Sequence, residues 1–248
     1  MPEPSSPSER SLSDGPSNAV FSDAELKGLQ APVQRYLQAA IAPGTPLMTS
    51  ARLRMRGRIR IGRWLPFTAH QTLNPHRGFV WTARVAGVIT GSDRYLDAVG
   101  AMSWKLAGLF TVAAAAGPDV SRSAAGRAAA EAVWLPTALL PRFGVTWSVE
   151  DANHITAHLR IGVTPVNLHL TLDPQARIRS LVFERWGDPE RSGLWALHAF
   201  GGEITGYRTF AGLTIPSAGR LGWHYGTDRW SAGEFFRYEI TGLNGPSE

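Results

Sequence analysis

Residues Ala51–Ile61 read ARLRMRGRIRI, and this stretch decides the fold prediction. Within it Arg52, Arg54, Arg56, Arg58 and Arg60 alternate with Leu53, Met55, Gly57, Ile59 and Ile61. A strict period of two places alternate side chains on opposite faces of a β-strand, so one face is cationic and the other is apolar. We expect the apolar face to point to the concave or helix-covered side of an antiparallel sheet and the arginines to lie on its wet, convex side.

The sequence around this strand continues the same pattern. Alternating runs separated by short turns extend to about residue 117, and the spacers are too short for a crossover helix. An alanine-rich stretch, SRSAAGRAAAEAVWL, then predicts a helix over 121–135, and a shorter one follows over 137–140. Strand patterns return at residue 145. We therefore predict an α+β fold, a single large curved antiparallel sheet (a half-barrel of about ten strands) with helices packed on one face.

The N-terminal region has a different composition. Residues 1–20 are rich in Pro, Ser and Glu, which predicts a disordered tail before a single half-barrel-like domain over 21–248. Ser22 and Glu25 have the spacing of a capping box at the start of a helix. Pro32 lies inside the helical pattern that follows, so we expect two short helices or one kinked helix.

Composition limits the chemistry. The 248 residues carry a formal net charge of +5, and Lys27 and Lys105 are the only lysines among the 25 basic residues. The absence of cysteine excludes disulfides, thiol catalysis and Cys-ligated metals. There is no apolar run long enough for a membrane span, no signal-peptide core and no cysteine for lipidation, so the expected location is the cytoplasm. We expect no cofactor.

The sequence carries no complete motif for metal binding, nucleophilic catalysis or phosphate binding. His154 and His158 lie four residues apart on a predicted strand, which places their Cα atoms about 13 Å apart and too far to share one ion. His169 on the next strand could face one of them across the sheet, and this allows at most a weak surface site. The sequence contains neither GxSxG nor SxxK, and it lacks the GxGxxG and GxxxxGK[ST] phosphate loops. We therefore expect no metal site.

The C-terminal third is dense in Trp, Gly, His, Asp and Arg, in the stretches WGDP, FGG, GLTIPS, GWHYGTDRW and GEFFR. One interpretation makes His224 a general base oriented by Asp228, with Asp188 or Glu203 as a second acid. The alternative, which we favour, is that Asp188 and Asp228 cap turns and pair with Arg185 or Arg229. Glu131 on the alanine-rich helix could point into a cavity, although a solvated helix face is the more common arrangement.

These stretches, together with YLDAVGAMSWKLAGLFTVAAAAGPDVSRSAAGRAAAEAVWLP before them, resemble an uncharacterised bacterial domain-of-unknown-function family over residues 32–240. The resemblance implies no established activity and no catalytic residues. More distantly, a strand block, a central helix and a second strand block resemble the half-barrel of the LolA and LppX lipoprotein carriers. The chain departs from those carriers in lacking an export signal and a lipidation cysteine, which weighs against their trafficking role but not against a cup shape.

Three functions compete. The favoured one is a non-catalytic binder or carrier of a hydrophobic, lipid-like ligand held in the cup of the half-barrel. Its lining would come from inward residues Phe67, Trp81, Trp104, Leu168 and Leu170, which could equally fill a dry core. The second is an enzyme at His224 and Asp228.

The third function is a weak contact with an anionic membrane surface through the arginines from Arg52 to Arg60. Solubility or protection of a sheet edge would also explain this row, and Glu234 or Glu239 on a neighbouring strand could balance it. Nucleic acid is not an expected partner, because no helix-turn-helix, zinc finger or aromatic stacking motif accompanies the charge. The sequence does not indicate an oligomeric state.

Overall fold

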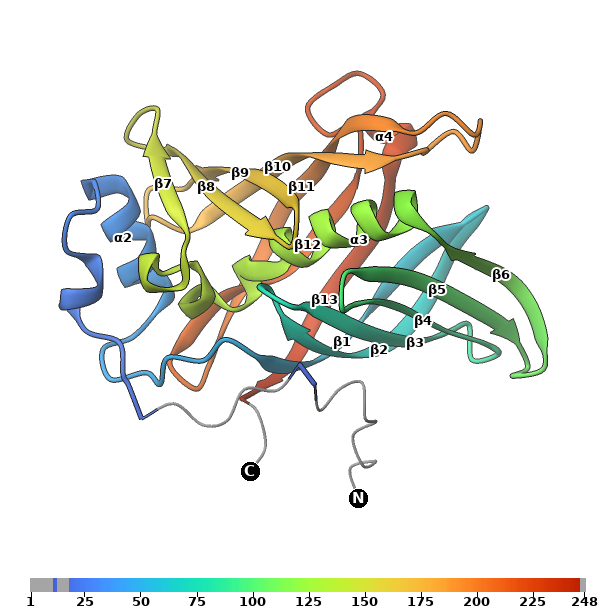
Figure 1. Ribbon diagram of the computed structural model, residues 1–248, viewed down its shortest axis with the longest axis horizontal. Coiled ribbons are helices and arrows are strands. Elements are labelled where there is room, and N and C mark those ends of the chain that lie inside the picture. The colour runs from blue at the N-terminus through green and yellow to red at the C-terminus, as the bar shows by residue number, and fades with distance from the viewer. Residues whose placement is uncertain (1–10, 13–17, 246–248) are drawn as a thin grey trace.

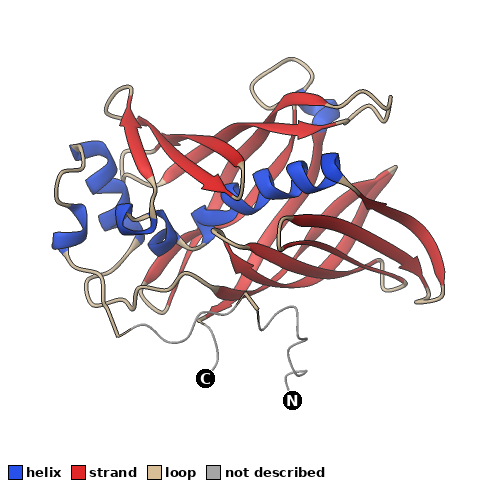
Figure 2. Ribbon diagram, viewed as in Figure 1, coloured by secondary structure: helices blue, strands red, loops and turns tan. Residues whose placement is uncertain are grey.

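The computed structural model describes residues 11–12 and 18–245, in which 13 strands form one curved antiparallel sheet (Figures 1 and 2). The strand order is β6-β5-β4-β3-β2-β1-β13-β12-β11-β10-β9-β8-β7. The strands are β1 (Ala51–Ile61), β2 (Arg63–Asn74), β3 (Gly78–Val85), β4 (Ile89–Leu96), β5 (Val99–Leu106), β6 (Phe110–Ala116), β7 (Thr146–Val149), β8 (His154–Ile161), β9 (Thr164–Leu172), β10 (Ile178–Gly187), β11 (Ala196–Phe210), β12 (Leu213–Trp223) and β13 (Glu234–Asn244).

The sheet consists of two meanders joined in its centre. Strands β1 to β6 follow one another from the centre to one edge, and β7 to β13 run from the other edge back to the centre. The join is the antiparallel pair of β1 and β13. This confirms the predicted α+β fold with one large curved sheet, and the two strand blocks are its two halves.

The helices are short. They are η1 (Asp23–Leu26), α2 (Ala31–Ala40), α3 (Pro118–Ala130), η2 (Glu131–Trp134), η3 (Pro136–Leu139), η4 (Pro141–Phe143) and α4 (Trp230–Gly233), where η denotes a 3₁₀ helix. Helix α3 packs on β3, β4 and β5 from one half of the sheet and on β8, β9 and β10 from the other. In Figure 1 it lies in the hollow between the two halves. Its alanines are buried there, which allows close contact with the strands.

Strand β1 has the two faces that its sequence predicts. Leu53 and Met55 are buried, while Arg54, Arg56 and Arg58 are exposed. Ile61 departs from the pattern and is 47% exposed, because it ends the strand beside the turn at Gly62. Since β1 is paired on both sides, protection of a sheet edge does not explain the arginines in the folded protein.

Other local predictions differ from the structure. From the sequence pattern alone, residues 101–112 would be expected to form one strand, but they belong to two, β5 and β6, because Ala107 and Gly108 turn the chain with positive φ angles of 51° and 72°. Similar short hairpins raise the strand count from about ten to 13.

At the N-terminus, two short helices are present as predicted, with Pro32 in the first turn of α2, where its missing N–H costs nothing. The predicted capping box does not form, since the Ser22 side chain makes no cap hydrogen bond. Most of the predicted disordered tail lies outside the described residues. Leu12, within it, is 1% exposed, and its carbonyl accepts a hydrogen bond from Asn74. Across 11–12 and 18–245, no helix is long and apolar enough to span a membrane.

Candidate functional site

A cavity of about 150 Å³ lies between the concave face of the sheet and the segment formed by α3 and η2. Residues from both halves of the sheet contribute to it, and most of its lining is aromatic or aliphatic. The lining residues are Ile59, Trp81, Asp93, Arg127, Ala130, Glu131, Val133, Trp134, Leu181, Phe183, Arg185, Phe200, Leu221, Phe235, Phe236 and Tyr238.

The aromatic wall results from regular alternation with one irregularity. Phe183 on β10 and Trp81 on β3 point inward at ordinary alternating positions and are 1% and 3% exposed. Phe235 and Phe236 are sequence neighbours, yet both line the cavity. The register between β12 and β13 shifts between Leu221 and Gly222, so a bulge turns both rings to the same side.

At one end of the cavity, a polar cluster centres on Arg127. Its guanidinium lies 2.7 Å from Glu131 and 3.1 Å from Asp93, and Gln71 donates a hydrogen bond to the second oxygen of Glu131. Burial lowers the pKa of Arg127, but the two carboxylates raise it by more, so it lies above its ordinary value. The side chains of Arg127 and Asp93 are 19% and 28% exposed, so this end reaches solvent.

A second arginine, Arg185, lines the same cavity but is held by aromatic rings and not by carboxylates. Its guanidinium lies over the rings of Phe200 and Trp223, at 4.6 and 5.1 Å from their centroids. In the described part of the chain, its buried Nε has no hydrogen-bond partner. Burial and the positive charge of Arg127 lower the pKa of Arg185 to about 10, so the group is still charged at neutral pH.

The five residues predicted to bind the ligand have different positions. Trp81 lines the cavity. Phe67 and Trp104 lie behind it, with ring centroids 6.0 and 5.7 Å from that of Trp81. Leu168 and Leu170 are fully buried on β9, a strand that packs under α3, and they are not among the lining residues. The structure therefore brings three of the five together at or behind the cavity wall.

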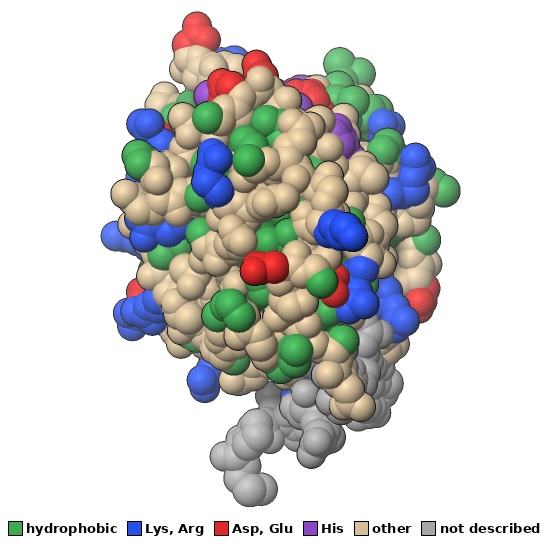
Figure 3. Space-filling view, turned by 90° about the vertical axis from the view of Figure 1, so that its left-hand side faces the viewer, with side chains coloured by type: hydrophobic (Ala, Val, Ile, Leu, Met, Phe, Trp, Pro, Cys, Tyr) green, Lys and Arg blue, Asp and Glu red, His purple; other side chains and the backbone are tan. Residues whose placement is uncertain are grey.

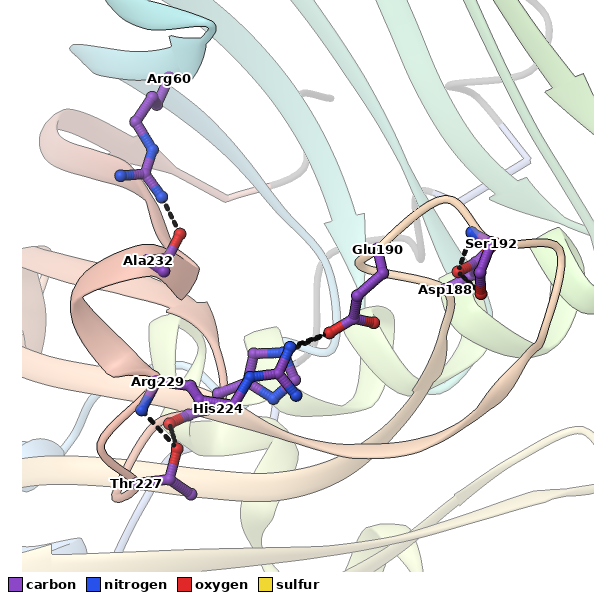
Figure 4. Close-up of polar contacts among 8 residues, drawn as sticks. All are labelled: Arg60, Asp188, Glu190, Ser192, His224, Thr227, Arg229 and Ala232. Carbon is purple, nitrogen blue, oxygen red and sulfur yellow. Dashed lines mark hydrogen bonds and ion pairs between the residues drawn. The ribbon is translucent and has the colours of Figure 1, made fainter.

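The arginine row lies on the outer face of the sheet centre. Arg56 pairs with Glu239 at 2.8 Å, and Glu239 also holds Arg208 at 2.9 Å. The expected acidic neighbour is therefore present. Arg60 reaches backbone carbonyls of α4, including that of Ala232 (Figure 4), and Arg58 reaches that of Trp64 at 3.5 Å.

The remaining arginines of the row are Arg52, which is half-buried, and Arg54, which is exposed. Figure 3 shows another face, the left side of Figure 1, where basic side chains are scattered among acidic and apolar ones. Among the described residues on that face, the basic side chains form no continuous surface.

The second predicted site has a different partner from the one expected. His224, with a backbone φ of +60°, places Nε2 3.1 Å from Glu190, which also binds Arg229 (Figure 4). Asp228 is exposed, and nothing in the described residues joins it to His224. The hydrogen bond from Arg229 lowers the pKa of Glu190. His224 is absent from the cavity lining.

The two other acids considered for that site make local contacts. Asp188 accepts hydrogen bonds from the backbone N–H groups of Ser192 (Figure 4) and Gly193, so it caps a loop as the alternative interpretation expected. Glu203 pairs with Arg220 on the adjacent strand. Neither contact brings these acids to His224.

The histidines of β8 also make local contacts. His154 binds Asp151 at 2.9 Å, and His158 lies 2.9 Å from both Ser148 and Asn167. Thr156, not either histidine, faces His169 across the sheet. Among the described residues, His, Asp and Glu form no group of three or more placed to hold a metal ion.

The charged part of the cavity was the least predictable from the sequence. Glu131 is 8% exposed and points into the cavity, so the expected solvated position is wrong. Arg185 pairs with neither Asp188 nor Asp228, contrary to the expectation for turn caps. A usable signal was present, because Leu181, Phe183 and Arg185 occupy alternate positions of one strand and share its inner face.

A curved, unclosed antiparallel sheet with a helix in its hollow and an apolar cavity between them defines this chain as an α+β half-barrel protein. The chain belongs to a family of unknown function, DUF6544, which matches residues 19–235. This confirms the membership of an uncharacterised family that the motifs indicated. No curated protein matches the chain.

Two solved structures are similar in fold. One is a domain named as an outer membrane lipoprotein-sorting protein from Vibrio parahaemolyticus, with 10% identity and a TM-score of 0.40 over 86% of this chain and 90% of that one. The other is a LolA superfamily protein from Nitrosomonas europaea, with 9% identity and a TM-score of 0.46 over 88% and 94%. The second bears the name of the carrier family that the sequence resembles.

Proposed function

We propose that this protein is a non-catalytic binder or carrier of a hydrophobic, lipid-like small molecule, held between the sheet and the α3–η2 segment. The observation that supports this most directly is the apolar cavity, which is lined by aromatic rings and has one polar end that reaches solvent. Concave apolar sites with a few placed polar groups are typical of small-molecule binding.

The energetics of packing support a binding role over a dry core. Protein interiors normally leave few voids larger than a water molecule. A cavity of about 150 Å³ is larger than the voids of an ordinary close-packed core, and it therefore supports a binding role.

The size of the cavity limits the ligand. A volume of about 150 Å³ corresponds to a cavity that admits one benzene-sized molecule. A longer chain requires movement of lining side chains. Leu221, Phe235 and Phe236 are half-buried and are the ones best placed to move. We therefore expect a slim acyl chain or a single ring with a tail that extends along these residues.

The experiment is a binding series on delipidated protein. Native mass spectrometry would detect added alcohols and acids of six to sixteen carbons, and brominated chains would quench the fluorescence of Trp81 and Trp134 in the cavity wall. We expect Leu221→Trp, which fills the cavity, to abolish binding. Val163→Trp, at a position that is 91% exposed in the β8–β9 turn, is the control that keeps it. No adduct and no quenching at any chain length would refute the proposal.

A further inference from the structure

We propose that the ligand is an amphiphile with an anionic headgroup, a carboxylate or a phosphate, and that Arg185 binds this headgroup. This inference rests on the proposed function, because it assigns the chemistry of the ligand that the cavity would hold. It is carried by the difference between the two arginines that share the cavity.

The two guanidiniums have similar surroundings but different partners. Each lies over aromatic rings, with Arg127 4.3 Å from the ring centroid of Phe79 and Arg185 4.6 Å from that of Phe200. Arg127 is bound by two carboxylates, those of Asp93 and Glu131. Arg185 has no such carboxylate within the part of the chain described here, and its Nε–H is buried without an acceptor. A buried donor without an acceptor is costly, and a ligand oxygen would remove that cost.

Hydrogen-bond capacity, more than total charge, determines the sign of the headgroup. The two arginines and the two carboxylates of the cavity sum to zero charge. The carboxylates, however, already accept hydrogen bonds, Asp93 from Arg127 and Trp104, and Glu131 from Arg127 and Gln71. An incoming cation would compete for occupied oxygens, whereas an incoming anion would find free donors on Arg185.

The position of Arg185 suits a headgroup whose chain enters the cavity. Its side chain packs beside α3, where a Cβ placed on Gly126 would lie 3.9 Å from Arg185 Cγ. The positive charge of Arg127 acts on Arg185, and both side chains line the same cavity. Leu181 and Phe183 follow on the same face of β10, toward the interior. A headgroup bound at Arg185 would therefore lead its chain into the apolar part. Of the two cations at this end, Arg127 is already paired with Asp93 and Glu131, which leaves Arg185 as the one to bind the headgroup.

The experiment compares dodecanoate, dodecyl phosphate, 1-dodecanol and dodecylamine at neutral pH by calorimetry. We expect the wild-type protein to bind at least one of the two anions about ten-fold or more tightly than the alcohol, and the amine least tightly, as charge-assisted hydrogen bonds imply. The tighter of the two anions identifies the headgroup. In Arg185→Met this preference should disappear while the affinity for the alcohol is kept, and Arg185→Lys should retain part of it.

The matched control is Arg122→Met, because Arg122 also stacks on a tryptophan, 3.8 Å from the ring centroid of Trp186, but does not line the cavity. It should keep the preference for the anion. If the wild-type protein binds the alcohol or the amine as tightly as both anions, or if Arg185→Met keeps the preference, the inference is wrong although the cavity still binds ligands. If none of the four molecules binds, the proposed function itself fails.

Discussion

Replacing Arg185 by methionine is expected to make the ligand-free protein more stable, although it removes a charged group that the proposed ligand needs. The folded state lowers the pKa of Arg185 from its ordinary value to about 10, chiefly through burial. A difference of one pKa unit between the unfolded and folded states corresponds to about 1.4 kcal/mol. Keeping this charge in the folded protein therefore costs on the order of 3 kcal/mol. Stacking on two aromatic rings offsets roughly 0.5–2 kcal/mol of that cost.

The expected net gain for Arg185→Met is therefore ~1–2 kcal/mol, since methionine fills similar space against the rings without a charge. The pKa of the folded state lies below that of the unfolded state. The full cost is therefore present below pH 10 and is relieved only as the pH rises above about 10, toward the pKa of the unfolded state. At neutral pH we expect a melting temperature that is higher by ~2–8 °C.

Guanidinium chloride unfolding and thermal melting at neutral pH measure this difference, and Arg127→Met is the comparison. That variant should lose about 3 kcal/mol or more, because it leaves the buried Glu131 carboxylate without its cation. Two arginines of one cavity should thus respond with opposite signs. The reasoning would be refuted by a loss of more than ~1 kcal/mol in Arg185→Met, since Arg185 would then be making a structural contact.

Three further outcomes are expected. Gly91→Ala should lose about 1–3 kcal/mol in denaturant unfolding and alter the tryptophan emission, because a Cβ there would lie 2.2 Å from Trp104; unchanged stability would contradict this contact. Phe183→Ala, at a position 1% exposed, should lose about 3–5 kcal/mol and bind longer alcohols, as calorimetry would show. The hydrogen bond from Arg229 lowers the pKa of Glu190, so their contact should be complete above pH 4.5 and lost as the pH falls further, and a carboxyl NMR titration with an ordinary midpoint would refute it.

The fold was predictable where one face of an element is buried and the other is wet. In β1 the alternation of Leu53 and Met55 with arginines is sufficient to define a strand and its inner face. The count of strands was less predictable, because turns such as Ala107–Gly108 join strands without a proline or a polar cluster to mark the break. The central pairing of β1 with β13 could not be predicted, because neither strand's sequence indicates which partner it pairs with.

The site was predictable only in its apolar part. Trp81 is inward by alternation, and its place in the cavity wall follows from that. Which arginine is paired depends on distances between β4, α3 and β10, and these are set by how the helix lies in the hollow. The bulge that turns both Phe235 and Phe236 inward also depends on the register between strands.

The pairing of β1 with β13 has a consequence for the order of folding. Each meander can form from hairpins of strands that are neighbours in the sequence. The pairing of β1 with β13, in contrast, brings together residues as distant as Arg56 and Glu239, which are 183 positions apart. Until it forms, both halves expose an unpaired strand whose inner side is apolar, a state prone to intermolecular strand pairing. The charges on the outer side of β1 would then act as gatekeepers against aggregation during that interval, a task that ends when the two halves meet.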